Sequence, residues 1–326
     1  MADEYEQRRD VHDHLHQEHH VEIPHERIMA TILIMFLLTQ ALGLYAGAQL
    51  TNKAPEIQEF KELSVAPTGN AGDLANVIFF IAYVLVGAAI MLIVIKFYKG
   101  VMAFKLMEVM IVMISGYVIG FALLRSFNVP NSSELAFAVA ALLAITKFFF
   151  KKAKNLVAII ASAGVGAIFG FSLDVVPAIV FISALSVYDV LAVYYTRHMI
   201  TMAKELGKRN LSFSVSAEEE IEPKKLKNLT EDQQQQVHEH LQSLPPEHRR
   251  TALELGTGDM AIPLMLAVAV LKWGGWVDSI AVIIGTTFGL GVVLYVVLKN
   301  RLFLPALPPL CFFGMLSLLI AKLAGF

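Results

Sequence analysis

The chain has 326 residues, of which 56% are hydrophobic and only 17% are charged, well below the roughly 25% of soluble domains. Its mean hydropathy of +0.61 excludes a single soluble domain, because one core cannot bury so much apolar surface, and indicates a polytopic membrane protein. The net charge of −2 identifies no partner. The single cysteine, Cys311, excludes an intrachain disulfide and any metal site built from several cysteines.

The first 27 residues form a polar tail that ends where the first apolar run begins, at Ile28. No cleavable signal peptide is expected, because that run is long enough to remain as an uncleaved first span. We interpret the tail as disordered and solvated rather than as a metal-binding tract. Its histidines are His12, His14, His16, His19 and His20.

Apolar runs separated by charged or proline- and glycine-rich breaks predict an all-α polytopic membrane protein with about nine transmembrane helices. A hydrophilic loop over residues 199–250 separates the first six spans (28–198) from the last three (251–326). Three cations, Lys151, Lys152 and Lys154, divide the fourth span from the fifth, because they fit an interfacial turn better than the bilayer interior. The predicted spans are 28–50, 74–95, 104–124, 134–150, 156–171, 175–198, 251–271, 277–298 and 302–324.

The distribution of lysine and arginine predicts the orientation of the chain. Alternate loops place about 21 of these residues on one side and about five on the other. Without the long loop the ratio is still roughly twelve to five. Because positive residues are enriched on the cytoplasmic side, the N-terminus is expected in the cytoplasm and, with nine spans, the C-terminus outside.

Two carboxylates lie inside predicted spans, Asp189 in the sixth and Asp259 in the seventh. An ionisable group at this depth is costly and usually functional. Each lies about eight residues from the cytoplasmic end of its span, which corresponds to roughly 12 Å of depth at 1.5 Å per residue. Because consecutive elements are usually neighbours, we expect the two carboxylates to face each other.

Such a pair has a definite chemistry. Two close carboxylates in a low dielectric do not both ionise easily and share a proton. One then acts as a base toward water while the other polarises a peptide carbonyl as an acid, as in aspartyl proteolysis. Gly256 and Gly258, just before Asp259, leave room for a substrate backbone. Tyr188 places a hydroxyl and an aromatic face beside Asp189.

A proline-rich segment opens the ninth span, also on the predicted cytoplasmic side. Its three prolines within residues 304–309 cannot start a regular helix and leave backbone groups unpaired. Such backbone is tolerated at membrane depth where it is buried in protein or lines a cavity. It is therefore expected to shape a cavity or to pair with an extended substrate. In the first span, Gln40 is expected to make an interhelical hydrogen bond rather than to take part in chemistry.

A cation channel or leak that uses the same carboxylates is the alternative function, because intramembrane acids also serve ion pathways. It would give ion flux that depends on Asp189 or Asp259 with no peptide product. Many transporters contain an internal repeat, and this sequence shows no clear one. The glycines before Asp259 also favour a function in peptide cleavage over ion transport. A structural scaffold would leave the cost of two buried carboxylates unexplained.

From Ile28 onward, the chain resembles the Gly-x-Gly-Asp intramembrane aspartyl proteases, because three motifs occur in order and in the expected spans. The matching motifs are Tyr188-Asp189, Gly256-Thr257-Gly258-Asp259 and Pro305-Ala306-Leu307. A cytoplasmic N-terminus favours the presenilin branch over the signal peptide peptidases, which have the opposite orientation. The compact length is similar to that of archaeal presenilin homologues.

The resemblance implies an integral protein of the cell membrane that cuts single transmembrane-helix substrates within the bilayer. It implies that Asp189 and Asp259 are catalytic and that Tyr188, Gly256 and Gly258 support them. Pro305, Ala306 and Leu307 would help to hold the substrate. No metal, organic cofactor or nucleic-acid partner is implied. Self-association and self-cleavage in the 199–250 loop are left open.

Overall fold

The computed structural model describes residues 26–53, 64–97, 102–150, 153–195, 213–220, 250–300 and 304–325. The predicted polar tail up to residue 25, with its histidines, and most of the predicted hydrophilic loop lie outside these residues. The chain divides into a small unit of residues 1–32 and 216–254 and a large unit of residues 33–215 and 255–326. The large unit contains nearly all of the described helices.

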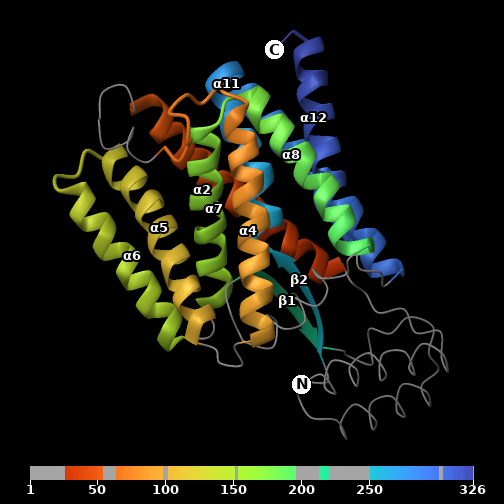
Figure 1. Ribbon diagram of the computed structural model, residues 1–326, viewed down its shortest axis with the longest axis horizontal. Helices are drawn as coiled ribbons and strands as arrows, with labels where there is room; N and C mark the ends of the chain where they lie inside the picture. Colours follow the sequence, from red (N-terminus) through yellow and green to blue (C-terminus); the bar gives the residue numbers. More distant parts are fainter. Residues whose placement is uncertain are drawn as a thin grey trace, which may run out of the picture. The chain divides into compact units, whose positions relative to one another are not determined.

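The described residues form eight α-helices, one of which, α11, joins two spans at Gly275 (Figure 1). Counting α11 twice gives nine apolar helices in this part of the chain, which confirms the predicted all-α membrane architecture. Among the described residues, six helices are long and apolar enough to cross a membrane. The helices are α2 (Glu26–Lys53), α4 (Ala75–Phe97), α5 (Met102–Ser126), α6 (Ser132–Phe149), α7 (Lys154–Ser172), α8 (Val175–Val190), α11 (Thr257–Asn300) and α12 (Leu307–Leu323).

Three helix boundaries differ from the sequence prediction by more than three residues, each for a local reason. The α-helical part of the sixth span, α8, ends at Val190 and continues as a π-helical turn, η2 (Leu191–Tyr195). The seventh span begins at Thr257 rather than at residue 251, because a β-strand precedes it. The ninth begins at Leu307 rather than at residue 302, because the chain at 304–306 is not helical.

That strand, β2 (Arg250–Gly256), pairs with β1 (Ser214–Glu220) in a two-stranded sheet that the sequence analysis did not predict. The backbone N–H and the hydroxyl of Thr257 donate to the carbonyl oxygen of Phe213 at 3.0 and 3.2 Å. These bonds join the end of β2 to the start of β1, so the two strands run antiparallel. The sheet leads directly into the first turn of α11.

The first half of α11 is the centre of the core. Its side chains from Leu264 to Val270 are at most 1% exposed. Helices α2 and α7 approach it closely through glycine, and a Cβ at Gly170 of α7 would lie 2.5 Å from the Cβ of Val268. Such small-residue contacts bring membrane helices together. Figure 1 shows α5 and α6 side by side, next to α7.

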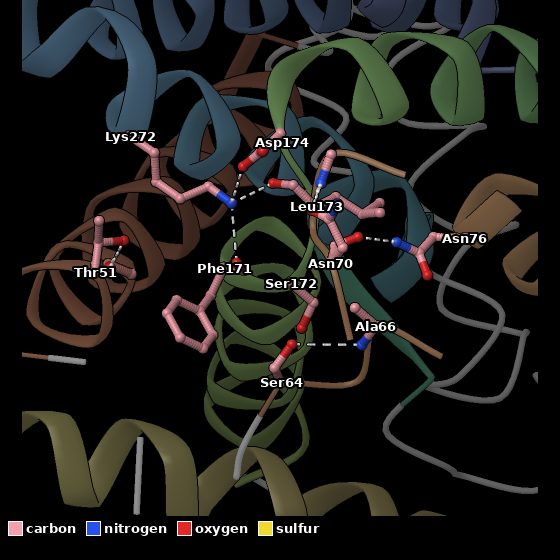
Figure 2. Close-up of polar contacts among 12 residues, drawn as sticks. Thr51, Ser64, Ala66, Asn70, Asn76, Phe171, Ser172, Leu173, Asp174 and Lys272 are labelled. Atoms are coloured by element: carbon pink, nitrogen blue, oxygen red, sulfur yellow. Dashed lines mark hydrogen bonds and ion pairs between the residues drawn. The ribbon is translucent and has the colours of Figure 1, made fainter. Parts of the chain in front are cut away.

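Lys272, near the end of the first half of α11, fixes the turn between α7 and α8 (Figure 2). Its ammonium group donates to the carbonyl oxygens of Phe171 at 2.9 Å and Leu173 at 2.5 Å, and lies 3.1 Å from a carboxylate oxygen of Asp174. The last carbonyls of a helix have no partner within it. A cation from α11 therefore satisfies the end of α7 and joins the two helices.

Candidate active site

Asp189 is the second-last residue of α8, two residues before η2 begins, and is only 2% exposed. The backbone N–H of Leu307, the first residue of α12, donates to its Oδ2 at 3.3 Å. The sequence predicted that the sixth and ninth spans both contribute to one site. The structure places their two motifs in direct contact.

The start of α12 explains why Leu307 is the donor. The first N–H groups of a helix have no partner within it and attract negative charge. Pro308 and Pro309 lack this group, and the N–H of Leu310 bonds to the carbonyl of Ala306 at 3.4 Å. The N–H of Leu307 is therefore available to the carboxylate. Pro305 is buried just before this turn.

Asp259 is the third residue of α11, at the end of the sheet. The backbone of Gly256 hydrogen-bonds to its carboxylate. This arrangement resembles one half of a capping box, in which an acidic side chain in the first turn reaches back to the N-cap backbone. A Cβ at Gly256 would lie 3.1 Å from Oδ2 of Asp259, whereas one at Gly258 would meet no atom of the described residues within 4 Å. Gly256 thus leaves space for the carboxylate, and Gly258 faces open space.

The structure places Asp189 and Asp259 within electrostatic range of each other. The two aspartates lie in different local structures. Asp189 follows almost the whole of α8, whereas Asp259 follows a strand and begins a helix. The half-buried Tyr188 also interacts electrostatically with Asp189.

Cys311 is a further residue near the site that the sequence analysis missed, because it considered this cysteine only for disulfides and metal binding. The thiol is buried, contacts the carbonyl oxygen of Ile182 at 3.9 Å, and lies within electrostatic reach of both aspartates. Its position four residues after Leu307 was the available signal, since residues i and i+4 lie on one face of a helix.

Gln40 lies on α2 and is fully buried. Its Nε2 donates to the carbonyl oxygen of Met260, the residue after Asp259, at 2.9 Å. The interhelical hydrogen bond predicted for this glutamine is therefore present, and it reaches the site itself. Within the described ranges, no group of three or more His, Cys, Asp or Glu side chains is arranged to hold a metal ion.

Comparison with known proteins identifies the class to which this fold and site belong. The family described as "Signal-peptide peptidase, presenilin aspartyl protease" matches residues 34–325, nearly the whole chain. The chain therefore belongs to this family, and it is an integral membrane protein and an aspartic endopeptidase of the intramembrane type.

Two solved structures, both of a presenilin family intramembrane aspartate protease, share the fold. The one in space group C222 is 20% identical with a TM-score of 0.57, over 90% of this chain and 97% of that chain. The one in space group P2 is 21% identical with a TM-score of 0.59, over 93% and 99%. Among curated proteins, no relative matches.

Proposed function

We propose that the protein hydrolyses peptide bonds within transmembrane-helix substrates and that Asp189 and Asp259 are its catalytic pair. The observation that carries this proposal is that two carboxylates from separate helices lie within electrostatic range of each other in a chain of the aspartyl protease family. Neighbouring carboxylates that share one proton supply both the acid and the base that peptide hydrolysis requires.

The hydrogen bonds around the pair support this role. Leu307 fixes the Asp189 carboxyl group, and the backbone of Gly256 fixes that of Asp259. One carboxylate removes a proton from a water, which attacks the peptide carbonyl carbon, while the other carboxyl group donates its proton to the carbonyl oxygen. The tetrahedral intermediate then breaks its C–N bond, and the released nitrogen takes up a proton from the pair.

The approach to Asp259 favours an extended substrate. An intact helix satisfies its own backbone and shields the peptide bond, so the segment to be cut has to unwind. The end of β2 leads into Asp259, and an extended segment can add to the edge of a sheet. The open space beside Gly258 admits a substrate backbone. The non-helical backbone at Pro305 and Ala306 borders the same site and would help to hold that segment.

The orientation follows from charge. About 21 lysines and arginines on one side against about five on the other favour a cytoplasmic N-terminus and an outside C-terminus. This orientation favours the presenilin branch, and the compact length is similar to that of the archaeal homologues. The cell membrane is the proposed location.

Cleavage of a single-span substrate in detergent tests the pair. Asp189→Asn and Asp259→Asn should each reduce the rate by at least about 10²-fold, because each removes one acid–base group. Asp73→Asn is the matched control. Asp73 caps α4 through its Oδ1, which accepts the N–H of Ala75 at 2.8 Å, and asparagine caps about as well. Cleavage at the parent rate by either site variant would contradict the proposal.

A further inference from the structure

Gln40 makes a hydrogen bond from α2 to the turn that carries Asp259. The side chain has no solvent exposure, and its Nε2 lies 2.9 Å from the carbonyl oxygen of Met260. The neighbouring Thr39 is also fully buried, and its hydroxyl lies 3.7 Å from the sulfur of Met260. Two consecutive polar residues of α2 thus contact the residue that follows Asp259.

The rest of the contact between these helices is apolar. One turn and two turns further along α2, Gly43 and Gly47 pack against Leu264 and Val268 of α11, so closely that a Cβ at either glycine would overlap them. These contacts hold α2 and α11 together along one line of close packing, which we call the seam. The amide of Gln40 contacts α11 at the end of the seam nearest the catalytic pair.

The first turn of α11 needs such a contact. In an α-helix the N–H of residue i donates to the carbonyl of residue i−4. Residue 263 is proline and has no N–H, so the carbonyl of Asp259 receives no such bond. The first turn of α11 therefore lacks one of its own hydrogen bonds. Gln40 donates to the next carbonyl along the chain, that of Met260, and holds the turn there.

Stability alone does not explain a glutamine at this position. Its Oε1 is buried and has no hydrogen-bond partner in the described part of the chain. A buried acceptor without a partner is destabilising, and an apolar side chain of similar size avoids that cost. The hydrogen bond to Met260 and the unpaired oxygen act in opposite directions on stability, so the net gain from the amide is small.

We propose that Gln40 is a positioning residue for Asp259, which acts through the Met260 carbonyl and touches neither substrate nor water in the reaction. The proposal rests on the proposed catalytic role of Asp259. Loss of the amide leaves the fold intact and lets the first turn of α11 move, so that the carboxyl groups meet in the productive geometry less often. The effect is on kcat rather than on KM.

Gln40→Met tests this, because methionine matches glutamine in length and cannot donate. We expect kcat to fall roughly 3- to 10-fold, as the loss of one hydrogen bond predicts, with KM unchanged and Tm equal to or above that of the parent. The matched control is Ser317→Ala. Ser317 of α12 also donates to the backbone of another span, the carbonyl of Ala281 at 2.5 Å. This control should lower Tm and leave kcat unchanged.

Three outcomes would overturn the role of Gln40. The first is a kcat of Gln40→Met equal to that of the parent. The second is a fall in the Tm of Gln40→Met as large as that of Ser317→Ala, and the third is failure of Gln40→Met to fold. The last two would show that the role of Gln40 is structural. Asp259→Asn in the same assay distinguishes the positioning role of Gln40 from the catalytic role of Asp259, on which it rests. If Asp259→Asn cuts normally, the catalytic assignment fails; if it is inactive while Gln40→Met is normal, only the positioning role fails.

Discussion

Two glycines near Asp259 have different surroundings, although the sequence motif presents them as equivalent. The space beside Gly256 is filled by the Asp259 carboxylate, whereas no atom in the described part of the chain lies within 4 Å of where a Cβ of residue 258 would be. The first glycine therefore allows the carboxylate to reach its position, and the second keeps open a place where a substrate backbone can lie. Changes at the two positions should affect different kinetic constants.

Gly256→Ala should lower kcat, because a Cβ 3.1 Å from Oδ2 has to displace the carboxylate. Gly258→Ala should raise KM with a smaller change in kcat, because it fills space that we propose for the substrate backbone. It should also raise stability by up to about 1 kcal/mol, since alanine is the better helix former. Initial rates over a range of substrate concentrations, with thermal unfolding, distinguish the two. Equal effects on kcat would contradict this difference.

At the scale of elements, a lysine of α11 supplies the cap that the end of α7 lacks. Lys272 bonds to two carbonyls and to Asp174, whose side chain is 54% exposed. An ion pair with so exposed a partner contributes little, whereas hydrogen bonds from a cation to buried acceptors contribute more. The capping of α7, rather than the ion pair, should therefore account for most of the stabilisation.

Lys272→Met should lower the free energy of unfolding by about 2 kcal/mol, because it leaves two carbonyls without a donor. Asp174→Asn should lower it by less than about 1 kcal/mol. The exposed Lys96, which lies over the ring of Phe97, provides a control in Lys96→Met. Thermal unfolding in detergent measures all three. A larger effect from Asp174→Asn than from Lys272→Met would assign the stabilisation to the ion pair.

The apolar helices could be predicted because hydropathy acts locally along the sequence. Asp189 and Asp259 could be singled out as candidate site residues because a charge inside an apolar segment is costly. The sheet was missed because charged and glutamine-rich residues dominate the loop. Leu253 and Leu255 alternate with the exposed Glu254, which is a strand pattern that was available. The hydrogen bond between Gln40 and Met260 was predicted only as an interhelical bond, since its partner is 220 residues away.

At the scale of the whole molecule, the predicted nine spans, an odd number, would place the two termini on opposite sides of the membrane. A reporter that is active only in the cytoplasm should work at the N-terminus and fail at the C-terminus, because positive residues stay inside. The same reporter inserted within residues 199–250 is the control and should be active. Activity at both termini would contradict the odd number of spans, and activity at the C-terminus alone would reverse the orientation.

The single thiol of the chain has a practical consequence. Cys311 is buried one helical turn beyond Leu307, near both carboxylates, and no other cysteine competes with it for a reagent. A small thiol-alkylating agent therefore modifies one cysteine, Cys311. Its rate of reaction measures how often the interior beside the aspartates opens to solutes, and the measurement needs no engineered label.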